Sequence, residues 1–369
     1  MVFSSFVAQL RTLPQQYHLG DGNPFTMPTA PAISRMSGSS VFEMKFSGGN
    51  SSVNASCCVG GPEGSSRLDL DIGTLTAKTS KAGRPSQQDG YYLCSIILSG
   101  MQYHVIAIVD GMGGQEGGDI AASAFLQGVH AAVMGRASSD LIPTPNCLFF
   151  SGVEALKAQR KYHEKNNADA VASLMVVNSY GEVASASAGD TVQFFLRSTD
   201  GRYQVRTHTP VCETFSRNVV TKSVAMTSPE NPPDLCKTDI QRGDIAILGT
   251  DGLFDRILPP DSKLHLCPGM DVGAMLGTSR YGQDFFRKLL DEAQRVSAEM
   301  ASGSVGRSGG RFQDSAERLY NLAHSLGSSG MDNITAVTLY FDPRRDFSNL
   351  GHGKNKMVHP LRSTKSKKK

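Results

Sequence analysis

The chain of 369 residues is 39% hydrophobic and 19% charged, which is typical of a globular protein that buries a substantial core. It contains no run of about 18 consecutive apolar residues, so we expect no membrane-spanning helix and no membrane partner. The net charge of +3 arises at the end of the chain, because residues 351–369 hold seven Lys or Arg and no acid. The remaining 30 Lys and Arg face 34 Asp and Glu, and this balance argues against a nucleic acid partner.

Both ends of the chain carry segments that we predict to be largely disordered. Residues 1–65 are rich in Ser, Gly, Pro and Thr without sustained periodicity, and residues 343–369 form a basic tail. The seven cysteines are odd in number and mostly far apart, which predicts a reducing compartment and no disulfide framework. We therefore expect a cytoplasmic protein. A nuclear address in the basic tail and an organelle or export signal in residues 1–19 are the alternatives.

Residues 66–342 carry strand and helix patterns throughout, and we predict a single folded domain here. Leu68, Leu70 and Ile72 alternate with polar residues, which is the period of a half-buried strand. So many buried strands predict either two packed sheets or one large covered sheet. The further predicted strands are 91–98, 103–109, 173–177, 182–188, 192–196, 245–249 and 334–341.

Four segments of this domain have helical periodicity. Apolar residues recur at helical spacing within residues 119–134, 153–166, 284–300 and 314–326. The Gly- and Ser-rich residues 301–311 predict a flexible loop between two of these helices. Because strands and helices alternate irregularly, the pattern is typical of an α+β protein.

Four aspartates lie where a predicted strand ends or begins. Asp110 and Asp251 each follow an apolar strand and precede a glycine, which lets the backbone approach a ligand closely. Asp190 follows another strand, and Asp332 precedes the last one. Each of them alone could be an ordinary turn residue. Together they could converge on a hard cation such as Mg²⁺ or Mn²⁺, which prefers oxygen ligands.

Five short motifs contain these aspartates and their neighbours. They are RPSQQD at 84–89, DGMGG at 110–114, GDT at 189–191, TDGLFD at 250–255 and DNIT at 332–335. In this order and at these separations, the motifs resemble those of the metal-dependent serine/threonine phosphatases of type 2C. The resemblance covers residues 67–341, and the five motifs together are much more specific than any one of them.

The resemblance implies both a fold and a reaction. The fold would be a four-layer α-β-β-α sandwich, in which antiparallel helices flank two antiparallel sheets. The reaction would be hydrolysis of phosphoserine and phosphothreonine in proteins, carried out by a water that bridges two Mg²⁺ or Mn²⁺ ions at one end of the sandwich. The expected partner is a phosphoprotein substrate in a signalling pathway, and the expected state is a monomer.

The resemblance also implies which residues hold the metals. Asp110 would bridge both ions and would be the central catalytic carboxylate. Asp251 and Asp332 would complete the ligands of the first ion, while Asp89 and the Gly111 carbonyl would hold the second.

Two further roles follow from the resemblance. Asp190, together with Asp251, matches the place where some members hold a third, weaker ion. Arg84 matches the arginine that binds phosphate, and its planar fork of donors suits phosphate oxygens.

Several positions depart from the family pattern. Met112 stands where many members carry a histidine that is a candidate general acid, and Met cannot donate a proton. Gln88 replaces a frequent Glu, which removes a negative charge near the second ion, and Thr191 and Val192 replace Ser and Arg. These departures support the rival hypothesis, a weak or inactive pseudophosphatase that acts as a regulatory binding module.

Overall fold

The computed structural model describes most of the predicted domain. None of the helices within the described residues is long and apolar enough to cross a membrane. The described residues are 44–48, 51–59, 63–70, 72–98, 100–112, 117–139, 141–162, 167–199, 202–208, 220–241, 243–257, 287, 291, 315–326 and 332–341.

The first sheet has seven strands in the order β1-β2-β5-β6-β7-β8-β11, and every neighbouring pair is antiparallel. Its interior strand β7 is buried along its whole length, because helices cover one face and the second sheet covers the other. The strands are β1 Met44–Gly48, β2 Ser51–Val59, β5 Asp89–Leu98, β6 Met101–Gly111, β7 Ala170–Asn178, β8 Glu182–Ala188 and β11 Asp234–Asp239.

The second sheet has six strands in the order β10-β9-β12-β13-β4-β3, again antiparallel throughout. Leu75 of β4 and Leu339 of β13 pack against Leu93 and Ile106 of the first sheet, in the core between the sheets. The strands are β3 Glu63–Leu70, β4 Gly73–Ser80, β9 Val192–Thr199, β10 Arg202–His208, β12 Ile245–Gly249 and β13 Ile334–Phe341.

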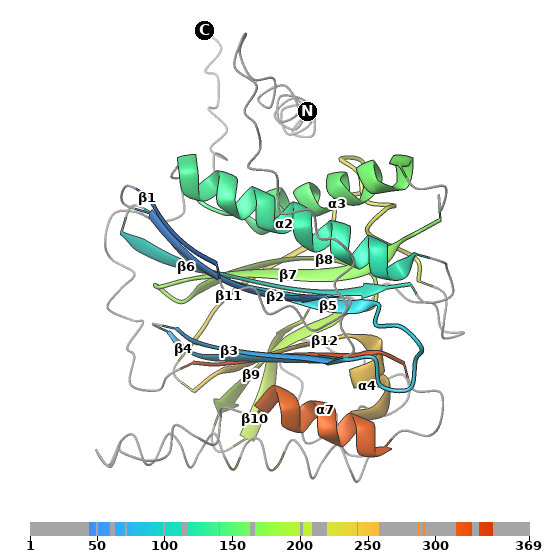
Figure 1. Ribbon diagram of the computed structural model, residues 1–369. Helices are drawn as coiled ribbons and strands as arrows, with labels where there is room; N and C mark the ends of the chain where they lie inside the picture. The colour runs from blue at the N-terminus through green and yellow to red at the C-terminus, as the bar shows by residue number, and fades with distance from the viewer. Residues whose placement is uncertain are drawn as a thin grey trace, which may run out of the picture.

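Helices form the two outer layers of the molecule (Figure 1). The helices α2 (Gly118–Ser139) and α3 (Pro145–Tyr162) cover the seven-stranded sheet, where Phe125 and Phe149 meet edge to face. The helices α4 (Asp251–Ile257) and α7 (Ser315–Leu326) lie against the six-stranded sheet. The predicted four-layer α-β-β-α sandwich is therefore confirmed.

Some predicted boundaries differ from those in the structure. The strands β1 and β2 lie within residues 1–65, so the prediction of disorder was too broad: their alternating Ser and Asn residues obscured the strand pattern. The helix α3 begins at Pro145, earlier than predicted, although proline at the first helical position is itself a start signal. The predicted helix 284–300 lies outside the described residues except for Arg287 and Asp291, which are helical. Residues 1–43 and 342–369 also lie outside them.

The contact between α2 and α3 depends on small residues. A Cβ atom added to Gly128 would lie 2.3 Å from the Ser151 carbonyl oxygen and 2.7 Å from the Ala155 Cβ atom. We expect Gly128→Ala to lower the free energy of unfolding by about 1–2 kcal/mol, because overpacking outweighs the higher helix propensity of alanine. Gly135→Ala is the matched control on the same helix, since its Cβ would meet nothing within 4 Å. Denaturant unfolding should show destabilisation for the first variant only, and equal effects would contradict the packing argument.

Candidate active site

The pairing of the strands brings two aspartates together on the seven-stranded sheet. Asp89 begins β5 and Asp110 lies near the end of β6, and the antiparallel register places the two directly opposite each other. Asp110 is also paired with Val171 at the start of β7. The carboxylates of Asp89 and Asp110 therefore lie at one end of this sheet.

The six-stranded sheet delivers two more aspartates to the same end. Asp251 is the first residue of α4, immediately after β12, and Asp332 lies just before β13. The chain segments approach closely here, because a Cβ atom on Gly252 would lie 1.9 Å from the Asn333 carbonyl oxygen. Asp190 follows β8 and is buried, and its negative charge acts on Asp110 and Asp251. The structure thus gathers all five predicted aspartates.

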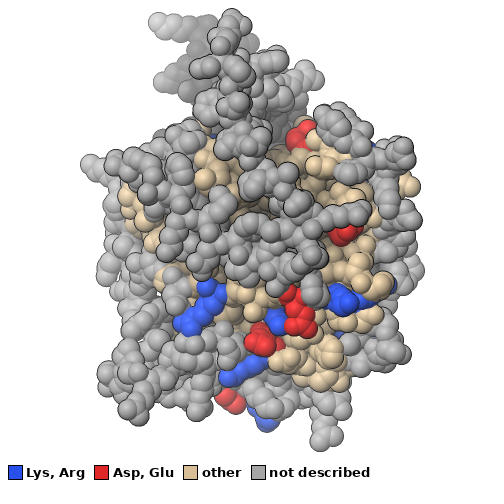
Figure 2. Space-filling model, in the orientation of Figure 1, with Lys and Arg blue, Asp and Glu red and all other residues tan. Residues whose placement is uncertain are grey.

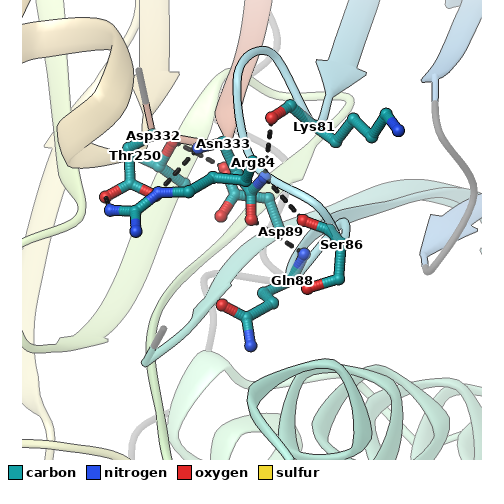
Figure 3. A network of polar contacts seen from close by, with 8 residues as sticks. All are labelled: Lys81, Arg84, Ser86, Gln88, Asp89, Thr250, Asp332 and Asn333. Carbon is teal, nitrogen blue, oxygen red and sulfur yellow. Dashed lines mark hydrogen bonds and ion pairs between the residues drawn. The ribbon is translucent and has the colours of Figure 1, made fainter. Parts of the chain in front are cut away.

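Arg84 lies on the loop between β4 and β5 and points at these carboxylates (Figure 3). Its Nη2 atom is 2.6 Å from Asp332 Oδ2, in an ion pair whose two side chains are 42% and 40% exposed. Hydrogen bonding to Asp332 and the negative charges of Asp251 and Asp110 raise the pKa of Arg84. Because an exposed ion pair of this kind contributes only about 0–1 kcal/mol, the guanidinium can leave Asp332 for another anion at little cost.

Two threonine hydroxyls hold the buried Asp89 carboxylate. Thr250 Oγ1 donates to Asp89 Oδ2 over 2.8 Å, and the Thr335 hydroxyl is a second hydrogen-bond partner. Thr335 is in turn 2.6 Å from Thr79, between their Oγ1 atoms. The other oxygen of Asp89, Oδ1, is buried without a hydrogen-bond partner, as is Oδ1 of Asp251.

Burial and mutual repulsion make the charged form of these carboxylates costly. Burial raises the pKa of Asp89 to about 7, although the hydrogen bonds from Thr250 and Thr335 act in the opposite direction. Burial, followed by the charges of the neighbouring aspartates, raises the pKa of Asp110 and of Asp251 well above the ordinary value. Both of these side chains nevertheless remain partly exposed. The site therefore holds negative charge that a cation would stabilise.

The donor set fits divalent cations that prefer oxygen. Among the described residues, no three His, Cys, Asp or Glu side chains stand in a closed cluster that would by itself hold a metal. The buried oxygens of Asp89 and Asp251 that lack a donor are nevertheless suitable ligands for Mg²⁺ or Mn²⁺, because both ions accept carboxylates and retain waters. The described residues thus provide neighbouring ligands rather than a complete cage.

Gly111 and three of the positions that depart from the family pattern, Gln88, Met112 and Val192, lie close to the site aspartates in the sequence. Gly111 lies against the start of α2, where a Cβ atom would meet the Gly118 carbonyl oxygen at 2.1 Å. The Gly111 amide donates to the Gln88 carbonyl, so Gln88 supports the site through its backbone. Met112 is partly exposed, whereas Val192 is fully buried at the start of β9. Val192 therefore cannot replace the arginine of the family pattern.

Sequence reasoning did not identify several residues around the site. Thr250 and Thr335 lie inside recognised motifs, but their contact with Asp89 spans distant parts of the chain. Asp169 accepts hydrogen bonds from Ser223 Oγ and the Ala225 amide, and its carbonyl accepts one from the Met112 amide. The predicted strand began at residue 173, so no predicted boundary pointed to Asp169, whereas β7 begins at Ala170, directly after it.

Comparisons with known proteins identify the fold. The sequence matches no family model and no curated protein, but the structure matches solved structures. A bacterial serine phosphatase superposes with a TM-score of 0.50 at 15% identity, over 74% of this chain and 99% of that one. The chain has the fold of the type 2C phosphatases.

Two other solved structures with this phosphatase fold come from mycobacteria. The serine/threonine phosphatase PstP of Mycobacterium tuberculosis has a TM-score of 0.46 at 16% identity, over 73% of this chain and 98% of that one. The PPM Ser-Thr phosphatase MsPP of Mycobacterium smegmatis has a TM-score of 0.45 at 17% identity, over 73% and 99%. The superposition on the bacterial serine phosphatase, at a TM-score of 0.50, shows the fold alone.

The raised pKa of Asp89 gives the stability of the metal-free protein a defined pH dependence. The folded state binds this proton more tightly than the unfolded state, so the contribution of Asp89 to stability is fully present below about pH 4 and is lost as the pH rises through about 7. We expect saturating Mn²⁺ to raise Tm by about 5–10 °C at pH 8 relative to EDTA. The shift should be much smaller at pH 5, where protons compete for the same oxygens. Equal shifts at both pH values would contradict the assignment of these carboxylates as ligands.

Proposed function

We propose that this chain is a metal-dependent phosphatase that hydrolyses phosphoserine and phosphothreonine in proteins. The convergence of Asp89, Asp110, Asp251 and Asp332 beside the Arg84 guanidinium carries this proposal. A cluster of carboxylates binds hard cations, and an arginine on its rim binds an anion. A phosphate ester is a substrate that requires both.

The residues of the chain would divide the reaction between them. Asp89, Asp110, Asp251 and Asp332 would hold two Mg²⁺ or Mn²⁺ ions, with Asp190 positioned for a third. When bound, the two ions would supply a water of lowered pKa and neutralise the phosphate charge. Arg84 would orient the phosphate oxygens and stabilise the charge that develops on them.

Proton donation to the leaving alkoxide lacks an obvious side chain. Met112 has no ionisable group, and the side chain of Gln88 cannot act as an acid at neutral pH. The leaving group would therefore take its proton from solvent water that reaches the partly exposed side of the site. Substrates with good leaving groups, such as aryl phosphates, should then be hydrolysed faster than alkyl phosphates.

The proposal extends to the partner, the oligomeric state and the location. We propose a phosphoprotein substrate, a monomeric enzyme and a cytoplasmic location. A nuclear signal in the basic tail and an organelle or export signal in the N-terminal segment are the alternatives. On the face seen in Figure 2, basic and acidic side chains of the described residues lie intermixed. A partner other than nucleic acid is compatible with this mixed surface.

The deciding experiment measures phosphate release from a phosphothreonine peptide by the full chain. Turnover that requires Mn²⁺ or Mg²⁺ and disappears with EDTA would support the proposal. No turnover in a folded protein that binds Mn²⁺ in a thermal shift assay would favour the pseudophosphatase instead. Gln88 and Met112, together with the open cluster of carboxylates, are the observations behind that second candidate.

A further inference from the structure

One buried side chain, that of Asn333, makes three hydrogen bonds to the loop that carries Arg84. Asn333, which is 2% exposed, accepts a hydrogen bond from the Gln88 amide at Oδ1 over 2.9 Å. Its Nδ2 atom donates to the carbonyl oxygens of Lys81 over 3.1 Å and of Ser86 over 3.0 Å. The amide of Asn333 thus contacts both ends of the loop (Figure 3).

Packing does little to hold the middle of this loop. Residues 83–86 are exposed, and within the loop the Arg84 amide donates to the Lys81 carbonyl. Three hydrogen bonds from a buried amide are therefore a substantial share of what holds the loop, at about 1 kcal/mol each.

The same short segment also orients the carboxylate that Arg84 contacts. The Asn333 backbone amide donates to Asp332 Oδ1 over 2.8 Å, while Asp332 Oδ2 binds Arg84. Residues 332–333 thus contact both the backbone of the loop and the Arg84 side chain. A shift of Asn333 would move Arg84 relative to Asp332.

We propose that Asn333 is a positioning residue that sets the location of Arg84 above the carboxylate cluster. The inference rests on the proposed phosphatase function, because the position of Arg84 matters only if Arg84 binds phosphate. Asn333 itself would touch neither the substrate nor the reacting atoms. It would act by keeping the loop of residues 81–88 in a single arrangement, and a misplacement of about 1 Å can cost about 100-fold in rate.

The alternative is that Asn333 merely stabilises the fold, and the chain offers a matched control for it. Asn178 is also buried and also makes three side-chain hydrogen bonds, which involve the amides of Tyr180 and Glu182 and the carboxylate of Glu182. It lies at the opposite end of β7 from the site. Asn178→Ala should therefore cost comparable stability without affecting phosphate binding.

The first test is a double-mutant cycle with Arg84 in the full chain. Asn333→Ala should lower kcat/KM for the phosphothreonine peptide about 10- to 100-fold, whereas Asn178→Ala should change it less than twofold. In an Arg84→Ala background, Asn333→Ala should add almost nothing, because the residue it positions is gone. A loss of the same size in both backgrounds, or a loss no larger than that of Asn178→Ala, would overturn the proposal.

The second test does not depend on turnover, and its first measurement uses only the wild-type protein. In the wild-type protein with EDTA, the Gln88 amide should exchange its hydrogen slowly, because Asn333 accepts it inside the fold. In Asn333→Ala, protection of Gln88 should be lost while β5 residues beyond it remain protected. Fast exchange of the Gln88 amide in the wild-type protein would overturn the positioning role of Asn333. Absent turnover with a protected Gln88 amide would count only against the proposed phosphatase function.

Discussion

Asp110→Asn is expected to lower metal-dependent phosphate release by at least about 100-fold, because a lost central ligand removes several kcal/mol of charge stabilisation. Asp110 lies opposite Asp89 in the register of β5 and β6, and the negative charges of Asp251 and Asp190 also reach it. The charges of the four other site aspartates therefore all act on Asp110. The measurement is phosphate release from a phosphothreonine peptide with Mn²⁺, compared with wild type and with an EDTA control.

The same variant should make the metal-free protein more stable. The pKa of Asp110 is raised in the folded state, so its charged form opposes folding at pH 8, and a neutral amide removes that cost. Asp239→Asn is the matched control, because Asp239 is an exposed acid on β11 and should affect neither property. Lower activity together with lower stability would mean that Asp110→Asn simply damages the fold, and retained turnover would rule out Asp110 as a central ligand.

Arg84→Ala is expected to lower kcat/KM by about 100-fold, the typical effect of removing one donor that stabilises transition-state charge. Arg84→Lys should recover only part of this loss, because lysine keeps the charge but lacks the planar fork that fits phosphate. The free energy of unfolding should change by less than about 1 kcal/mol, because the ion pair with Asp332 is half exposed.

Metal binding should respond to Arg84→Ala in the opposite direction. The guanidinium occupies Asp332 and adds positive charge beside Asp251 and Asp110, so its removal should lower the Mn²⁺ concentration that gives a half-maximal Tm shift. Weaker activity with tighter metal binding would identify Arg84 as a residue for the substrate. Weaker metal binding in Arg84→Ala would instead show that the loop supports the ligands, and the assigned role would be wrong.

The strand pattern alone left two packed sheets or one large covered sheet open, and the resemblance of the five motifs to those of the type 2C phosphatases predicted the sandwich and the roles of the site aspartates. Apolar strands that stop abruptly at Asp110 and Asp251 combine a buried element with a polar end, and this pattern is local. The edge strand β11 was not predicted, because its apolar Leu235 is exposed while the polar Asp234 and Thr238 are partly buried, so hydropathy does not follow burial along it. Sheet edges have weaker hydrophobic signals than sheet centres.

The contacts that organise the site depend on strand register and were beyond local patterns. Asn333 meets Gln88 across 245 positions of sequence, and Thr250 meets Asp89 across 161. No periodicity within either segment indicates which residue of the other it will face. A motif can therefore identify a ligand, while its hydrogen-bond partners require the fold.

The carboxylates come from both sheets, with Asp89 and Asp110 on one and Asp251 and Asp332 on the other. An ion held between them would cross-link the two sheets at one end of the sandwich. Under a mechanical load that pulls the sheets apart, the loaded protein should open first at the opposite end, where side-chain packing and contacts such as the hydrogen bond from Arg197 of β9 to the Asp239 carbonyl of β11 join the layers. The metal-free protein should separate from either end and at lower force.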